Sequence, residues 1–171
     1  MNLTELLKDK DLKAKAKVET ISEWLLTGQL TESDWCLATG ATKEADIANC
    51  IEAMEFATQK HPEILSKDGF SLVSETLTAK APRVKWESAK VIGNTARLFP
   101  DQLDTALKNL LNNAHHEGTV VRWSAAFALG EIVKLKLPHN KDLIPALQAI
   151  SAAEEKNSIR KIYQSAFIVV K

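Results

Sequence analysis

The sequence predicts an all-α fold in which helix pairs repeat along the chain, and three observations support this. Glycine and proline are scarce, at six and five residues among 171, and runs of β-branched residues are short. Apolar residues recur at steps of three and four almost throughout, which is the spacing of one helix face. The chain also resembles itself at a shift of 37 residues. A period of that length is typical of stacked helical units.

N-capping residues, prolines and helix breakers divide the chain into ten expected helices. Pro62, Pro82 and Pro100 each precede or begin a stretch with helical spacing, as expected of a residue that is tolerated in the first turn. Pro145 is the exception, because it lies within a segment, either in its first turn or ahead of a later start. Most connections are short, so consecutive helices should be antiparallel neighbours. The expected helices span residues 2–8, 11–27, 31–38, 42–60, 63–79, 82–98, 101–114, 119–136, 141–154 and 158–170.

The clearest repeat lies in the C-terminal half of the chain. The segment from Val84 reads VKWESAKVIGNTA and the segment from Val121 reads VRWSAAFALGEIV. A third copy begins at Ile159, and weaker copies begin near Ile47 and Ala14. A less regular helix such as QLDTALKNLL precedes each copy, so the repeating unit is a helix pair. Four pairs are identical at the shift of 37, namely Val84 and Val121, Trp86 and Trp123, Ala89 and Ala126, and Gly93 and Gly130.

The string VRWSAAFALGEI, with a helix and a short turn before it, resembles the second helix of a HEAT repeat. The resemblance covers residues 82–171 well and residues 2–79 by pattern alone. It implies a single domain over residues 1–171, folded as a right-handed superhelical α–α solenoid of about five HEAT-like helix pairs. HEAT motifs are degenerate, so the match concerns the fold and says almost nothing about function.

The net charge and its distribution along the chain limit the classes of function that the sequence supports. The chain has 22 basic and 22 acidic residues, without the strongly basic balance of a dedicated nucleic-acid-binding protein. Residues 30–78 carry three basic and nine acidic side chains, whereas residues 79–171 carry fourteen basic and eight acidic ones. The middle of the chain is therefore acidic and its C-terminal half basic, either as ordinary solvated helix faces or as a surface for a polyanion.

The cysteine content and the lack of long apolar runs indicate the compartment. Cys36 and Cys50 form no C-x-x-C pair, which argues against a disulfide scaffold or a thiolate zinc site and suits a reducing environment. No apolar run approaches the roughly 18–20 residues of a membrane span, and residues 1–17 are too charged for a signal peptide. We therefore expect a cytoplasmic protein with no membrane contact and no cofactor.

Basic residues recur at one position near the start of three second helices, as Lys85, Arg122 and Arg160. There they oppose the helix macrodipole, so each requires a compensating contact. We expect structural hydrogen bonds to a turn carbonyl or a carboxylate, rather than ligand binding. HEAT-like turns often carry an acidic residue before the basic one, and Glu117 precedes Arg122 and Glu154 precedes Arg160. No acidic residue takes that place before Lys85.

Aromatic and basic residues share the stripe of the second helices that lies opposite their apolar stripe. Because second helices line the concave surface of HEAT-like solenoids, the resemblance implies a groove with aromatic and cationic walls, suited to a partner protein. The same rings could instead cover the seam between neighbouring second helices, where Gly93 and Gly130 permit close approach. Both alternatives stay open at this point. The candidate partner-binding residues are Trp86, Lys90, Arg97, Trp123, Phe127, Lys134 and Lys161.

These features favour a non-enzymatic protein-interaction or scaffold module. The alternative is binding of nucleic acid or another polyanion by the basic C-terminal half, including a role like that of HEAT-like DNA glycosylases, which the chain resembles in architecture. Such enzymes need a carboxylate in a basic aromatic cleft, and the sequence offers Glu87 and Glu131, neither in the tryptophan stripe. We expect no catalytic residue and no metal, because residues 115–117 (His-His-Glu) lack the spacing and further ligands of a metal site.

The end of the sequence carries a separate expectation. Residues 162–170 read IYQSAFIVV, although terminal repeats normally present a polar outer face. This predicts a C-terminal edge that packs against a partner or a second copy, giving a possible homodimer.

Overall fold

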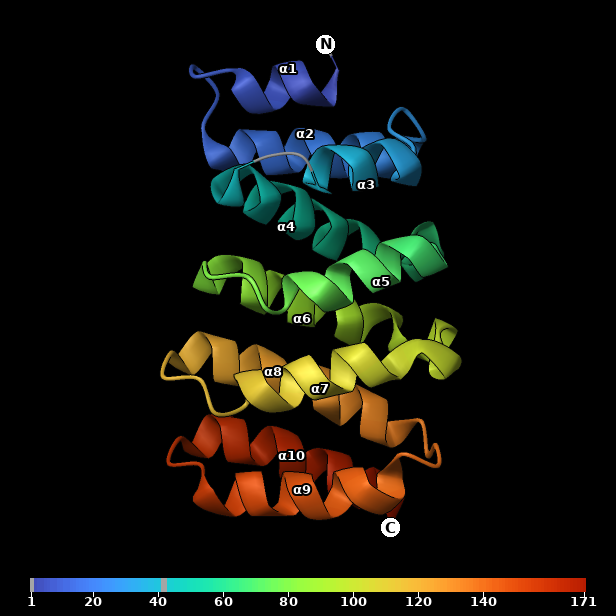
Figure 1. Cartoon of the computed structure of the whole chain (residues 1–171), viewed down its shortest axis with the longest axis vertical. Helices are drawn as coiled ribbons and strands as arrows, with labels where there is room; N and C mark the ends of the chain where they lie inside the picture. Colours follow the sequence, from blue (N-terminus) through green and yellow to red (C-terminus); the bar gives the residue numbers. More distant parts are fainter. Residues whose placement is uncertain (1, 41–42) are drawn as a thin grey trace.

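The computed structural model describes residues 2–40 and 43–171, and that part of the chain is helical without strands. Five helix pairs stack along one axis, with the N-terminus and the C-terminus at opposite ends (Figure 1). This confirms the all-α solenoid. No described helix is both long and apolar enough to cross a membrane. The helices are α1 (Leu3–Lys8), α2 (Ala14–Thr27), α3 (Glu32–Gly40), α4 (Glu44–Lys60), α5 (Lys67–Thr76), α6 (Pro82–Thr95), α7 (Leu103–Asn113), α8 (Thr119–Lys134), α9 (Asn140–Ala153) and α10 (Asn157–Val170), with 3-10 turns η1 (Pro62–Ile64), η2 (Ala96–Leu98) and η3 (Pro100–Gln102).

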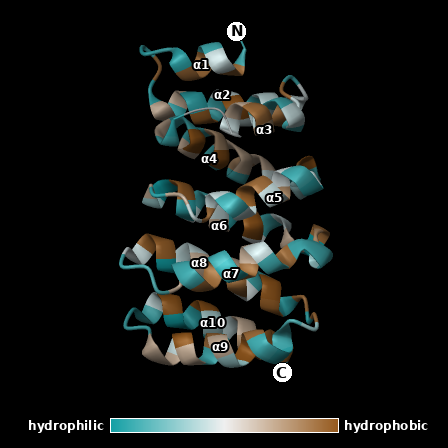
Figure 2. Cartoon of the chain, viewed as in Figure 1, coloured by the Kyte–Doolittle hydropathy of each residue, from teal (hydrophilic) through white to brown (hydrophobic). Residues whose placement is uncertain are grey.

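The two helices of each pair form two layers. The second helices α2, α4, α6, α8 and α10 pack against one another in that order, whereas neighbouring first helices approach each other much less. The second helices therefore form the more closely packed layer of the stack. We call the side of the second helices that faces away from the first helices the second-helix face. Hydrophobic residues occur in every layer of the stack (Figure 2), and the core runs through it continuously.

Buried polar side chains fix the helices to one another. Lys17 Nζ donates to the carbonyl of Leu7 at 2.6 Å, which satisfies the end of α1. Asn113 Nδ2 on α7 donates to the carbonyl of Leu77 at 3.0 Å, just after α5. Side-chain bonds of this kind satisfy carbonyls that lack a partner at helix ends, and they set the register of successive repeats.

Three expected helices are shorter in the structure than predicted, because a 3-10 turn takes one end. Residues 63–79 divide into η1 and α5, since the Ser66 hydroxyl accepts from the Gly69 N–H at 3.2 Å and caps a new helix. Residues 101–114 begin in η3 before α7, and residues 82–98 end in η2 after α6. Prolines at the first position of η1 and η3 explain the tight starts.

Other boundaries differ by a few residues. The helix expected from residue 11 starts at Ala14, because the Asp9 carboxylate accepts from the N–H groups of Asp11 and Leu12 in a turn. The predicted start at residue 42 lies outside the described residues, and α4 begins at Glu44.

The structure corrects the prediction that Pro145 lies in the first turn of a helix or before its start. It is the sixth residue of α9 and lies inside the helix. The side chain is exposed, so water can hydrate the carbonyl that lacks its helical donor there.

Candidate functional site

Two adjoining hollows open on the second-helix face around Phe127. One, of about 320 Å³, lies between α6 and α8, and the other, of about 290 Å³, lies between α8 and α10. Phe127, Glu131 and Lys134 line both hollows. Arg97 lines the first hollow and Lys161 lines the second. The structure therefore brings together four of the seven candidate partner-binding residues, namely Arg97, Phe127, Lys134 and Lys161.

The sequence left open whether the aromatic rings cover a seam between second helices or line an exposed groove, and Phe127 has a part in both. Its ring lies over Gly93 so closely that a Cβ atom there would stand 2.4 Å from the ring atom Cε1. The ring therefore covers the seam between α6 and α8. Trp123, one turn earlier, stacks on Phe127 with ring centroids 6.1 Å apart and planes 11° apart, and it is 41% exposed. The aromatic pair is thus anchored in the seam and open to solvent at its outer ring.

The charges around these hollows are predominantly positive. Lys134 Nζ lies 2.6 Å from the Glu131 carboxylate, which neutralises one cation. Arg97 and Lys161 are exposed and form no salt bridge within residues 2–40 and 43–171. The surface therefore presents aromatic rings between two available cations, a combination that suits acidic or aromatic side chains of a ligand.

Trp86 and Lys90, the other two candidates, belong to a separate polar cluster at the seam of α4 and α6. Trp86 Nε1 donates to Glu87 Oε1 at 2.7 Å. Lys90 Nζ lies 2.7 Å from Glu87 Oε2 and 3.7 Å from Glu55 Oε2. Both carboxylates are buried, and the single ammonium group of Lys90 lies between them as their shared cation. Burial raises the pKa of Glu87, although the hydrogen bonds from Lys90 and Trp86 oppose this.

The raised pKa of Glu87 gives a pH-dependent prediction. The folded protein retains the Glu87 proton at a pH where the unfolded chain has released it, so this group lowers stability as pH rises from the unfolded pKa to the folded pKa. Glu87→Gln keeps an acceptor for Trp86 and removes the titration. We expect the free energy of unfolding of the variant, relative to the parent, to increase as pH rises above the unfolded pKa of about 4.3. Urea titrations followed by circular dichroism measure it, and a pH-independent difference would contradict the assignment.

The two carboxylates considered for a glycosylase-type role require a correction. The expectation that neither belongs with the aromatic stripe is wrong, because Glu87 bonds the Trp86 ring and Glu131 lines both hollows beside Phe127. The Glu87 side chain reaches back across the roughly 100° between adjacent helix positions, whereas Glu131 lies four residues after Phe127 and therefore on the same helix face. Glu87 is buried and held by Lys90, and Glu131 is paired with Lys134, so each carboxylate has a structural partner.

The recurring basic residues near the second-helix starts lie in different surroundings. Arg122 donates to the carbonyls of His116 and Glu117 at 3.0 and 2.9 Å and to Glu154 at 2.9 and 3.4 Å. Lys85 Nζ reaches the carbonyl of Leu77 and Asn113 Oδ1, each at 3.3 Å. Arg160 is half-buried and has no hydrogen bond of this kind among the described residues.

The His115-His116-Glu117 segment forms part of a turn. His116 Nδ1 accepts from the Gly118 N–H at 2.9 Å, which uses this ring nitrogen locally. Within the residues that the structure describes, no group of three or more histidine, cysteine or acidic side chains has a metal-binding arrangement.

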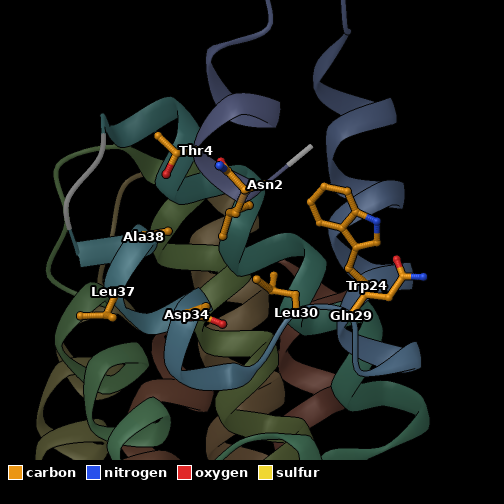
Figure 3. A pocket seen from close by; sticks show the side chains of 9 residues that line it. Asn2, Thr4, Trp24, Gln29, Leu30, Asp34, Leu37 and Ala38 are labelled. Atoms are coloured by element: carbon orange, nitrogen blue, oxygen red, sulfur yellow. The ribbon is translucent and has the colours of Figure 1, made fainter.

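The sequence did not indicate two larger hollows near the N-terminus. One, of about 840 Å³, lies between α1, the end of α2 and α3, with Trp24 on one side, Leu37 and Ala38 on the other and Asn2 between them (Figure 3). The second, of about 660 Å³, lies between α2 and α4 and includes Phe56. Helical periodicity assigns such residues to helix faces, but only the packing of separate helices creates the space between them.

The stacked pairs and the open second-helix face define an α-solenoid of the armadillo and HEAT type. No protein-family model matches the sequence, and no curated protein matches it. Solved structures share the fold. A designed armadillo repeat protein in complex with the peptide (KR)4 is 19% identical with a TM-score of 0.77, covering 99% of this chain and 80% of that chain.

Two further structures extend the comparison. Computationally designed armadillo repeat proteins for modular peptide recognition are 18% identical with a TM-score of 0.74, covering 98% of this chain and 80% of that chain. The complex of CpcE and CpcF of phycocyanin lyase from Nostoc sp. PCC7120 is 19% identical with a TM-score of 0.71, covering 96% of this chain and 97% of that chain. At these identities the likeness concerns the fold.

Proposed function

We propose that this chain is a non-enzymatic scaffold whose second-helix face binds a linear segment of a partner protein. The observation that carries the proposal is the stacked pair of Trp123 and Phe127, open to solvent between two hollows and flanked by Arg97 and Lys161. An aromatic or aliphatic side chain of the segment enters a hollow beside Phe127. Acidic side chains of the segment lie against the two cations, which makes the ligand an acidic peptide.

The architecture supports peptide binding over catalysis. A designed armadillo repeat protein of the same fold is in complex with the peptide (KR)4, so a protein of this fold can bind a peptide. Fold alone does not determine function, and the side chains on the face therefore decide the ligand. Here aromatic rings occupy the centre and charges the rim, as in the hot spots of protein interfaces.

The charge pairing favours a peptide over a nucleic acid. Lys134 is neutralised by Glu131, which leaves Arg97 and Lys161 as the available cations of the two hollows. Proteins that hold nucleic acid tightly neutralise about six to ten phosphates. Two cations and an aromatic pair suit the few acidic groups of a peptide better.

A labelled peptide tests this proposal. The probe is a fluorescein-labelled peptide of twelve residues in which glutamates flank a central tryptophan, and binding to the full chain is followed by fluorescence anisotropy. We expect Trp123→Ala and Phe127→Ala each to weaken binding at least tenfold, or by about 1.4 kcal/mol, because each removes part of the aromatic surface. Leu37→Ala is the matched control, since Leu37 is 72% exposed on the first-helix layer.

Three results would count against the proposal. The peptide could fail to bind, or it could bind equally to the parent and to both aromatic variants. Single-stranded DNA of similar length could also bind more tightly than the peptide, with an affinity that falls steeply as salt is added. That last result would favour the polyanion alternative.

A further inference from the structure

The three C-terminal second helices carry equivalent residues where each packs on the second helix before it. Counted from the start of each repeat copy, the seventh residue is Lys90 on α6, Phe127 on α8 and Ser165 on α10. Lys90 crosses the α4–α6 seam, because its Nζ atom lies 3.7 Å from Glu55 Oε2 on α4. Phe127 crosses the α6–α8 seam and lies over Gly93. At both seams a long side chain therefore covers the preceding second helix.

The α8–α10 seam lacks this cover. Ser165 is exposed, and its hydroxymethyl group is too short to span two packed helices, whose axes lie about 8–10 Å apart. Gly130 is the equivalent glycine at this seam. A Cβ atom there would lie 3.7 Å from Ile162 and 3.6 Å from Ala166, which is ordinary contact. Thus α10 packs closely on α8, but Ser165 leaves the place of the ring open.

The hollow of about 290 Å³ lies at this place. Gly130, Ile162 and Ser165 line it from α8 and α10, and Phe127 separates it from the α6–α8 hollow. Pockets that take whole small molecules measure about 300–1,000 Å³, so this volume suits a single side chain. The preceding seam indicates which side chain fits, since an aromatic ring lies there over the equivalent glycine.

The surroundings of the hollow favour an aromatic ring over an aliphatic group of equal size. Lys161 lines the hollow, is exposed and forms no salt bridge within residues 2–40 and 43–171. A free ammonium group is attracted by the face of an aromatic ring. The Phe127 ring adds an aromatic contact on the other side. An aliphatic group gains neither interaction.

We propose that the hollow between α8 and α10 is the subsite for an aromatic side chain of the partner segment. The ligand ring covers this seam as Phe127 covers the seam before it, and an acidic neighbour in the segment meets Lys161. The α6–α8 seam already has its ring over Gly93, so the ligand ring belongs to the other hollow. This inference rests on the proposed function, because it assigns one residue of the same ligand to one of the two hollows.

A ring built into the chain tests the subsite without any ligand. Ser165→Phe places a ring at the position equivalent to Phe127, where it can cover Gly130. We expect this variant to unfold at a higher urea concentration than the parent, because the ring buries apolar surface in the hollow. Gln164→Phe is the matched control, since it adds the same ring at the neighbouring exposed position, about 100° away on α10. It should not raise the urea midpoint.

The same variants test ligand binding by fluorescence anisotropy with the glutamate–tryptophan peptide. In the parent, replacing the central tryptophan of the peptide by alanine should weaken binding at least about tenfold. Ser165→Phe should abolish this preference, because its own ring occupies the subsite. Gln164→Phe and Ser165→Ala should retain it. A peptide with central phenylalanine should bind the parent about threefold more tightly than one with cyclohexylalanine, which has a ring of similar size without aromatic character.

The possible failures are distinguishable. If Phe127→Ala weakens binding but Ser165→Phe retains the tryptophan preference, the ligand ring lies elsewhere, so the inference is wrong and the proposed function stands. If Ser165→Phe unfolds at no higher urea concentration than Gln164→Phe, the hollow does not accept a ring and the inference is wrong whatever the peptide does. If no peptide binds to the parent, the proposed function fails and the ligand subsite is rejected with it.

Discussion

We expect Trp35→Ala to lower the free energy of unfolding by about 4 kcal/mol, the typical loss when a large core ring is truncated. Trp35 is fully buried in α3, and its Nε1 atom donates to the carbonyl of Cys50 on α4 at 2.9 Å. Truncation therefore leaves a cavity between the helices of one pair and removes the hydrogen bond that orients them. Because the second helices form a continuous layer, the loss should appear in the unfolding of the whole domain.

A conservative variant separates the two contributions. Trp35→Phe retains much of the apolar volume but has no N–H group, so we expect a loss of about 1–2 kcal/mol. Urea unfolding followed by far-ultraviolet circular dichroism measures both variants. Equal losses for Ala and Phe would show that the hydrogen bond, and not the volume, dominates. A loss below about 1 kcal/mol for Trp35→Ala would contradict the packing described for α3.

The fold could be predicted from the sequence because equivalent residues of successive repeats are buried in the same way. Val84 and Val121 recur at a shift of 37, and both side chains are fully or almost fully buried. The weaker copy near Ile47 also matches the copy from Val84 at a shift of 37. Thr58 and Thr95 are buried, and each donates its hydroxyl to the carbonyl four residues earlier, Met54 and Val91. Each repeat must bury the same stripe, so the periodicity predicts the stacking.

The site was predicted only in part, because periodicity describes one helix at a time. The wheel placed Trp86 and Phe127 on equivalent stripes, yet Trp86 bonds a buried carboxylate whereas Phe127 covers Gly93. The residue on the neighbouring helix decides which occurs, and the repeat pattern does not specify it. The hollow that contains Phe56 was missed for the same reason, since α2 and α4 create it jointly.

The second large effect concerns the ion pair that joins the fourth and fifth repeats. Arg122 bonds two carbonyls of the turn before α8 and the buried carboxylate of Glu154, which precedes α10. Arg122→Ala leaves that carboxylate buried without its guanidinium partner and frees the turn. We expect a loss of about 3 kcal/mol in the free energy of unfolding. Arg160→Ala is the matched control at the same repeat position, and its expected loss is below about 0.5 kcal/mol.

The pH dependence of this loss identifies its origin. Burial of Glu154 opposes ionisation, but the hydrogen bonds from Arg122 and from the Lys156 N–H outweigh it, so the pKa of Glu154 lies below its usual value. The stabilisation is therefore complete above the unfolded pKa of about 4.3 and is lost as pH falls through the lower folded pKa. The difference between Arg122→Ala and the parent should shrink in acid. A difference that persists undiminished at low pH would assign the stabilisation to the turn carbonyls instead.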